Sequence, residues 1–179
     1  MEYLNEQDRL QLLTAALKEN KTFHLMLALS FAHGLRVTEL LSLRAKDVSD
    51  DRIHIVALKR GHTVNQTVLV HSNPLIDCSP VFALAASLAP EDKLFNISRW
   101  TVNRWMKAIG TGIDPAKLHH HACRHSTAMF VYKTSQSLGQ VSSILRHRSM
   151  ASSMIYLREM DASKALAARD AAMAAMVSE

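Results

Sequence analysis

The stretch from His121 to Tyr156 constrains the fold more than any other part of the sequence. His121 and Arg124 are three residues apart, so on a helix they lie on one face and can address the same small anion. His147 and Tyr156 are nine residues apart, or two and a half helical turns, which would put them on opposite faces of one straight helix. The two can meet only if the chain turns between them. We predict this turn at Arg148-Ser149, with the serine as N-cap of a new helix.

Arg36 lies at a second constrained place, a tight junction between two predicted helices. The helix from about Thr22 to His33 is rich in leucine, methionine and phenylalanine, is expected to be buried, and stops at Gly34. The next helix, Thr38 to Arg44, follows at once and carries Glu39 in its first turn. The junction can therefore hold the Arg36 side chain rigidly.

The remaining patterns predict an α+β fold that is mostly helical, with a small antiparallel β-sheet or hairpin. Residues 53–58 alternate with a period of two, and a polar turn, KRGHTVNQ, leads into a second predicted strand, TVLV. Lys59 and Arg60 would lie near the tip of this hairpin. Further helices are predicted over about fifteen residues after Asn5 as N-cap, over 80–89, after Ser98 as N-cap, from near His121, from Leu138 to Arg146, and along the alanine-rich tail 162–179.

Composition indicates one globular domain without a membrane span or a disulfide framework. The 48% hydrophobic and 21% charged content is ordinary, and 179 residues can bury a core without disulfides. No run of 18 apolar residues exists, and the N-terminus lacks the apolar segment of a signal peptide. Cys78 and Cys123 do not form a disulfide framework, so a cytoplasmic location is the expectation.

The charge balance favours a polyanionic partner. The formal net charge is +5, and ten histidines add latent positive charge. Many basic proteins never bind nucleic acid, so this balance alone does not select DNA.

Three boxes, taken together, resemble the tyrosine recombinases of the phage-integrase family. They are HGLRVTELLSL (residues 33–43), HACRH (residues 121–125), and LRH (residues 145–147) followed nine residues later by Tyr156. The order and spacing carry the resemblance, which runs from about Leu4 to about Leu157. It implies the catalytic fold of that family. Two positions depart from the family pattern: Arg146 stands where glycine is usual, and Cys123 stands where leucine is usual.

Phosphodiester cleavage without a metal needs a nucleophile, cationic donors for the phosphate oxygens, and an acid for the leaving oxygen. Tyr156 is the nucleophile candidate, and Arg36 and Arg124 suit the phosphate because each guanidinium can fork onto two oxygens. Lys59, desolvated beside two arginines, suits the role of acid. The resemblance implies these same roles, with His147 donating to the phosphate, His121 assisting proton transfer, and support from Glu39 and His125.

Each of these residues also has a structural interpretation. Arg36 could cap the preceding helix, Lys59 could belong to a solvated turn with Arg60 as the functional alternative, and Glu39 is expected to steady Arg36 rather than to react. Tyr3 and Tyr132 are interpreted as structural. Trp100 and Trp105 are interpreted as core residues rather than platforms on which bases stack. The run from His119 to His121 does not predict a metal site, because consecutive helical positions diverge by about 100° each.

The resemblance implies site-specific recombination of double-stranded DNA through a 3′-phosphotyrosyl intermediate, without metal or cofactor. It also implies a homotetramer on paired DNA and an origin in a phage or mobile element. The alternatives are a non-catalytic DNA-binding protein of the same fold and a type IB topoisomerase-like activity. Residues 1–179 are expected to be a single catalytic domain that lacks the family's separate N-terminal domain. The chain would then be either a fragment or a short recombinase like the fimbrial-switch invertases.

The tail over 162–179 is the expected connector between subunits. Its apolar positions form a narrow stripe of Leu166, Met173, Met176 and Val177. The alternative is that this helix folds back on its own core.

Overall fold

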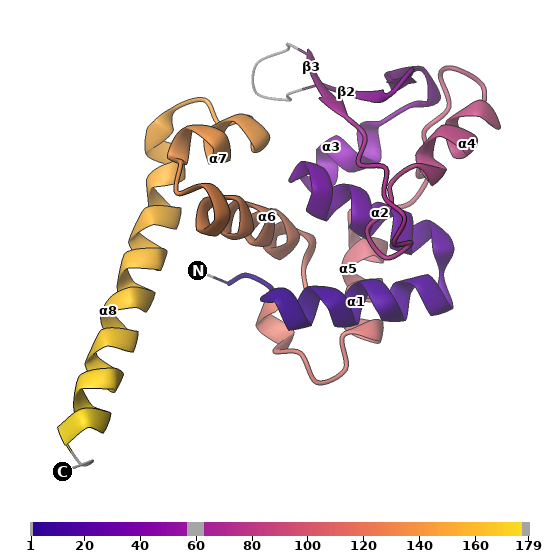
Figure 1. Ribbon diagram of the computed structural model, residues 1–179. Helices are drawn as coiled ribbons and strands as arrows, with labels where there is room; N and C mark the ends of the chain where they lie inside the picture. The colour runs from indigo at the N-terminus through magenta and orange to yellow at the C-terminus, as the bar shows by residue number, and fades with distance from the viewer. Residues whose placement is uncertain (1, 57–62, 177–179) are drawn as a thin grey trace. The chain divides into compact units, whose positions relative to one another are not determined.

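The chain forms two compact units, which are described one at a time. The structure is a computed structural model that describes residues 2–56 and 63–176 (Figure 1). The larger unit comprises Glu2–Thr127 and the smaller unit begins at Ala128. Among the described residues, helices predominate and one small antiparallel sheet is present. The expected fold class is therefore confirmed.

Two helices organise the core of the larger unit. Helix α1 (Glu6–Glu19) begins with a capping box, in which the Asn5 side chain accepts from the Asp8 backbone N–H and the Asp8 carboxylate accepts from the Asn5 N–H. Helix α2 (Lys21–His33) is capped by Asn20 and is buried along almost its whole length. A helix that is apolar on all sides belongs in the centre of a domain. The other elements of the larger unit therefore surround α2.

The junction after α2 has the predicted geometry. Gly34 adopts the left-handed conformation, with φ of 56°, which a glycine accepts without the steric penalty that a Cβ atom brings. Arg36 is extended and precedes helix α3 (Val37–Ser42). Three residues thus connect the buried α2 to the short helix α3.

The predicted extent of the helix after Arg36 is wrong at its end. Helix α3 ends at Ser42, and the short 3₁₀ helix η1 (Ala45–Asp47) follows. The backbone between them pairs with residues 90–94: Leu94 N–H donates to Leu43 O, and Ala45 N–H donates to Asp92 O. These backbone bonds replace those that a longer α-helix would make.

The sheet has three strands in the order β1-β2-β3, all antiparallel. They are β1 (Val48–Ser49), β2 (Arg52–Val56) and β3 (Thr63–Thr67). The predicted second strand, TVLV, is wrong, because β3 pairs Thr63 with Val56 and Thr67 with Arg52. Val68 is buried beyond the strand, whereas Leu69 and Val70 are exposed. The apolar run therefore marks the end of the sheet and not its last strand.

Two further helices complete the larger unit. They are α4 (Pro80–Ala86) and α5 (Arg99–Ile109). The short 3₁₀ helix η2 (Pro115–Lys117) follows α5 and precedes α6. The Ser98 side chain caps α5 as predicted. Trp105 packs edge-on against Phe23, with ring centroids 5.1 Å apart, as expected for a core residue. Trp100 is 69% exposed beneath the Arg104 guanidinium, so its interpretation as a core residue is wrong.

Helix α6 (His120–Ser135) starts in the larger unit and continues into the smaller one. The smaller unit then contains α7 (Leu138–Ile144), the 3₁₀ helix η3 (Met150–Ser153) and α8 (Met154–Met176). The predicted turn at Arg148-Ser149 is confirmed, because Ser149 precedes η3 and η3 leads directly into α8. Ser149 holds the N-cap position of η3, but its side chain makes no capping hydrogen bond there. Tyr156 therefore lies in the first turn of α8.

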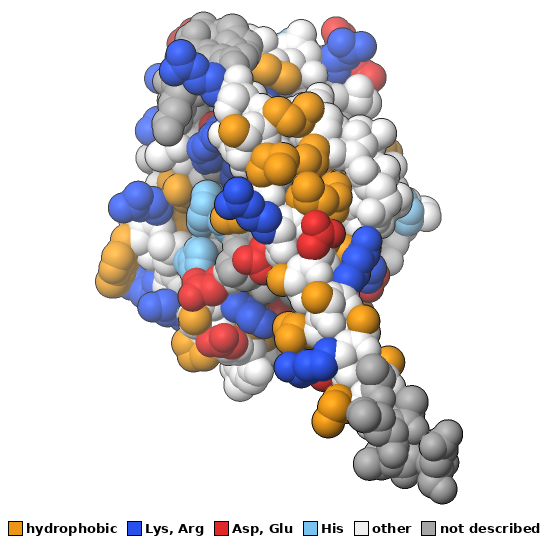
Figure 2. Space-filling model, turned by 90° about the vertical axis from the view of Figure 1, so that its left-hand side faces the viewer, with side chains coloured by type: hydrophobic (Ala, Val, Ile, Leu, Met, Phe, Trp, Pro, Cys, Tyr) orange, Lys and Arg blue, Asp and Glu red, His pale blue; other side chains and the backbone are white. Residues whose placement is uncertain are grey.

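The tail predicted as helical is the distal part of α8. Hydrophobic side chains are interspersed with charged ones along this helix (Figure 2), and Leu166 and Met173 are exposed. The side chain of Met176 and the whole of Val177 lie outside the described residues. None of the helices described is both long enough and apolar enough to cross a membrane.

Candidate active site

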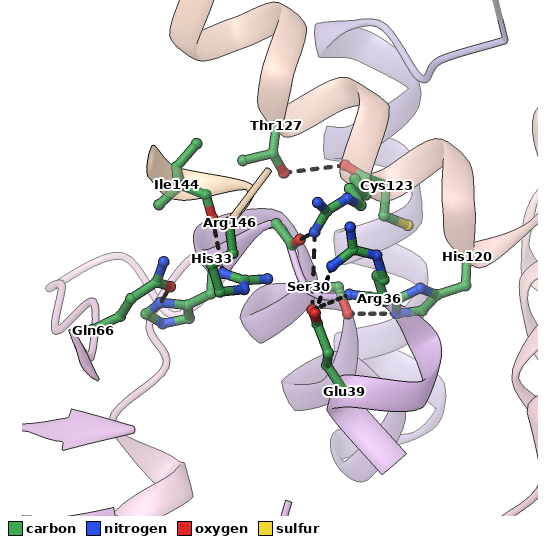
Figure 3. A network of polar contacts seen from close by, with 12 residues as sticks. Ser30, His33, Arg36, Glu39, Gln66, His120, Cys123, Thr127, Ile144 and Arg146 are labelled. Atoms are coloured by element: carbon green, nitrogen blue, oxygen red, sulfur yellow. Dashed lines mark hydrogen bonds and ion pairs between the residues drawn. The ribbon is translucent and has the colours of Figure 1, made fainter. Parts of the chain in front are cut away.

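A buried carboxylate, Glu39, organises the cationic part of the candidate site. Its side chain is fully buried, and it accepts from the Arg36 guanidinium at 2.7 Å and from the Arg36 backbone N–H at 2.9 Å (Figure 3). Glu39 lies one helical turn after Arg36, so the same carboxylate caps the start of α3 and fixes the arginine. This is the supporting role that the sequence predicts for Glu39.

The second arginine, Arg124, reaches the same carboxylate from α6. Its Nη1 donates to Gly34 O at 2.6 Å and lies 3.8 Å from Glu39 Oε2. Arg124 is 2% exposed, whereas the Arg36 side chain is 32% exposed. Two guanidinium groups share one carboxylate, so the cluster of Arg36, Glu39 and Arg124 keeps a net charge of about +1 when all three groups are ionised. The arrangement can bind an anion at the more exposed arginine.

Helix α6 is held against α2 by polar contacts that the sequence analysis missed. His120 Nε2 lies 2.8 Å from Ser30 Oγ, and that hydroxyl donates to Met26 O at 2.6 Å. Because the serine has a single proton, His120 must donate through Nε2–H. Thr127 Oγ1 also donates to Phe31 O at 2.9 Å. The sequence signal for these contacts is Ser30, a hydroxyl within the apolar run that extends from Leu25 to Ala32.

The candidate histidines His121 and His125 lie together on α6, with ring centroids 4.3 Å apart. Partial burial, with smaller contributions from the positive charges of Arg124 and nearby groups, lowers the pKa of His121 below its ordinary value. Burial also lowers the pKa of His125 to about 4. Both imidazoles are therefore neutral near pH 7, and a neutral imidazole can accept a proton.

The three consecutive histidines do not converge on one point. His119 Nε2 lies 3.3 Å from Glu2 Oε2, His120 contacts Ser30, and His121 contacts His125. In the part of the chain that the structure describes, no group of three or more histidine, cysteine or acidic side chains is arranged to hold a metal ion.

In the smaller unit, backbone hydrogen bonds at the end of α7 fix the direction in which the His147 side chain points. The His147 N–H donates to Ser142 O, and the Arg146 N–H donates to Ser143 O. This pair of bonds is a Schellman motif, and its C′ residue, Arg146, has the left-handed φ of 54°. The strain costs a residue with a side chain roughly 1–2 kcal/mol. This left-handed conformation explains why glycine is usual at this position in the family pattern.

His147 and Tyr156 meet because of the turn between α7 and α8. Their rings are nearly parallel, with an interplanar angle of 8° and centroids 6.2 Å apart. His147 Nδ1 lies 2.8 Å from the hydroxyl of Ser153, which is fully buried. Tyr156 is itself 2% exposed. Ser153 was not foreseen, because only the fold of η3 brings it beside the histidine.

The structure thus brings the predicted residues together in two sets. Arg36, Glu39, Arg124, His121 and His125 lie in the larger unit, and His147 and Tyr156 lie in the smaller unit. Lys59 and its alternative Arg60 fall outside the described residues. The interpretation of Tyr132 as structural agrees with its burial.

Replacing Glu39 with glutamine should destabilise the fold, because it removes the negative charge that both arginines contact. We expect the free energy of unfolding to fall by about 3 kcal/mol, as when one member of a buried ion pair is removed. Denaturant unfolding followed by circular dichroism measures this. Glu91→Gln is the matched control, since Glu91 also bonds a cation at 2.7 Å but on an exposed surface. Equal losses in the two variants would contradict the proposed importance of Glu39.

Stability should also depend on pH through His120. Burial lowers the pKa of His120 from 6.5 to about 4, so the unfolded chain takes up a proton in this window while the folded chain does not. The folded state is therefore favoured above pH 6.5 and loses stability as the pH falls toward 4. In His120→Gln the slope of the unfolding free energy against pH should decrease by up to about 1.4 kcal/mol per pH unit, because the unfolded state no longer takes up one additional proton. Denaturant unfolding across this range, with exposed His71→Gln as control, tests this; an unchanged slope in His120→Gln would refute it.

Comparison with known proteins identifies the family of the chain. The Phage integrase family profile matches residues 2–163. A tyrosine recombinase of Pseudothermotoga lettingae is 27% identical over 152 residues, which cover 82% of this chain and 52% of the relative. Tyrosine recombinase XerA of Pyrococcus horikoshii is 24% identical, over 78% of this chain and 51% of the relative. The chain spans about half the length of these curated relatives.

Solved structures share the fold. The catalytic domain of bacteriophage HP1 integrase matches with a TM-score of 0.64 and 21% identity, over 88% of each chain. The crystal structure of XerA recombinase matches with a TM-score of 0.70 and 24% identity, over 92% of this chain and 63% of the other. From the profile match over residues 2–163, this chain belongs to the phage integrase family.

Proposed function

We propose that this chain is the catalytic domain of a site-specific tyrosine recombinase. In the proposed reaction, the Tyr156 phenol oxygen attacks a DNA phosphodiester, forms a 3′-phosphotyrosyl bond and releases a 5′-hydroxyl. A 5′-hydroxyl from a partner strand then attacks that bond, regenerates the phenol and rejoins the DNA. Each step exchanges one phosphate ester for another, so no external energy source is needed.

The pairing of His147 with Tyr156 is the observation that carries this proposal. The tyrosine lies in the first turn of α8, and its ring faces an imidazole whose Nδ1 is engaged by Ser153. We assign this imidazole to the reacting phosphate, where a hydrogen-bond donor would stabilise developing charge. Because Tyr156 is buried, its hydroxyl must become exposed before it can react with DNA.

The cluster of Arg36, Glu39 and Arg124 supports the same reaction from the larger unit. A pentacoordinate phosphate gains negative charge on its non-bridging oxygens, and guanidinium forks held in place can stabilise that charge without rearranging. Glu39 holds both arginines while leaving the cluster a net positive charge. Neutral His121 supports proton transfer, with His125 beside it.

Lys59 completes the proposed set as the acid that protonates the leaving oxygen, with Arg60 as the alternative. This assignment rests on the sequence resemblance. The tail over 162–179 is proposed as the connector in a homotetramer on paired DNA. A lambda integrase tetramer bound to a Holliday junction, whose catalytic fold this chain shares, supports that assembly.

The decisive experiment is capture of covalent protein–DNA complexes. The protein would be incubated with a pool of randomised duplexes, nicked so that the short 5′-hydroxyl fragment diffuses away, and the products run on a denaturing gel. Adducts are expected in EDTA, because the arginines supply the charge that a metal ion would supply. Absence of adduct, or adduct only with Mg²⁺, would overturn the mechanism. A non-catalytic DNA-binding protein gives no adduct, and a topoisomerase-like enzyme relaxes supercoils without exchanging strands.

Tyr156→Phe should abolish the covalent adduct while leaving DNA affinity nearly unchanged. Only the phenol oxygen is lost, and the ring can still stack against His147. Adduct formation on the gel and binding by fluorescence anisotropy measure the two effects. Tyr132→Phe is the control and should still form adduct. If Tyr156→Phe forms adduct and Tyr132→Phe does not, the nucleophile is misassigned.

Arg36→Lys and Arg124→Lys should each slow adduct formation by about 10²–10³-fold, the size seen when one oxyanion donor is removed. Lysine keeps the charge but loses the planar fork that binds two phosphate oxygens. Single-turnover rates on the captured substrate give the comparison. Arg44→Lys, at a partly exposed position paired with Glu91, is the matched control. Near-normal rates in the Arg36 and Arg124 variants would show that charge alone suffices.

A further inference from the structure

Arg146 occupies the position in the smaller unit where a side chain is least favoured. It is the C′ residue of the Schellman motif that closes α7, and its φ is 54°. Glycine is preferred here because it has no Cβ to clash in the left-handed conformation. A strained backbone position beside a candidate active-site residue is a reason to look for a function.

The side chain of Arg146 is held as well as its backbone. Its Nη1 donates to Ile144 O at 2.8 Å, and the residue is 8% exposed. The guanidinium is thus fixed over the last turn of α7 (Figure 3). The bond to the carbonyl orients the guanidinium, and a guanidinium is ionised at any pH at which the protein is folded.

The position also determines what Arg146 can reach. The next residue is His147, which the same motif aims at Tyr156. An arginine fixed in this turn therefore adds a cation beside the pair to which we assign phosphate chemistry. One guanidinium group can donate two parallel hydrogen bonds to two oxygens of the same phosphate.

We propose that Arg146 is a phosphate-binding residue of this chain, contacting the DNA backbone at or next to the phosphate that Tyr156 attacks. This proposal rests on the proposed function. The strained conformation is kept because the side chain at this position binds substrate, and glycine would relieve the strain but lose the contact.

The test compares Arg146→Gly with Gln136→Gly. Gln136 lies in the same unit between α6 and α7 and has a φ of 52°, so it carries nearly the same backbone strain without a charge. Both glycine variants should unfold at a higher denaturant midpoint than the parent protein. Only Arg146→Gly should alter DNA binding. Affinity for a random-sequence duplex would be measured by anisotropy from low to moderate salt.

Loss of one phosphate contact should reduce the slope of log affinity against log salt by about 0.9 in Arg146→Gly. Arg146→Lys should keep most of the parent slope, and Gln136→Gly all of it. Adduct formation should slow at least tenfold in Arg146→Gly alone. A purely structural role, in which the side chain only caps α7, would lower the unfolding midpoint and leave the salt slope unchanged.

An unchanged salt slope in Arg146→Gly overturns the proposal, whatever happens to adduct formation. The salt slope requires only DNA binding, so it decides the role of Arg146 even if the parent protein forms no covalent adduct. Absence of a covalent adduct with the parent protein would overturn the proposed function instead. The two failures are therefore distinguishable.

Discussion

The contact on which the larger unit most depends is the sharing of Glu39 between Arg36 and Arg124. A buried carboxylate is costly unless it is paired and hydrogen-bonded, and two buried or half-buried guanidinium groups side by side would repel each other. The two arginines stabilise the buried carboxylate, and the carboxylate offsets the repulsion between the arginines. The carboxylate also caps α3 through the Arg36 N–H, so the local fold and the charge arrangement cannot be separated. The site can hold two cations close together only because the corner after α2 is built around this one anion.

The smaller unit reaches its geometry by different means. Backbone hydrogen bonds at the end of α7 fix the direction of His147, and a single hydroxyl, that of Ser153, fixes its ring. Side-chain ion pairing decides where the arginines of the larger unit point, whereas main-chain geometry decides where the histidine and tyrosine of the smaller unit point. Substitutions will therefore act differently in the two units. In the larger unit the charge of a residue matters most, and around His147 the allowed backbone conformation matters most.

Local signals in the sequence predicted much of this arrangement. Asn5, Gly34 and Ser98 mark helix ends through contacts within a few residues, so they could be read directly. The interval between His147 and Tyr156 required a turn, which the structure contains. Other features depend on partners distant in sequence. The end of α3 is set by pairing with residues 90–94, and the extent of β3 by its register with β2.

The same distinction holds for the site. The candidate residues could be named from the three boxes and the family resemblance that they carry, but their supporting contacts could not. His120 contacts Ser30 across ninety positions, and the exposure of Trp100 depends on which face of α5 meets the core. Glu39 lies between these cases. Its capping of α3 is local, and its contact with Arg124 requires the docking of α6 onto α2.

Helix α8 makes the nucleophile and the tail parts of one rod. The helix continues from Met154 to Met176, a rise of about 35 Å, and Tyr156 is its third residue. A rigid rod transmits rotation along its whole length. A turn of the distal end by one residue's worth, about 100°, would swing the phenol away from His147 by the same angle. The rotation of the tail about the helix axis and the orientation of the Tyr156 hydroxyl are therefore coupled.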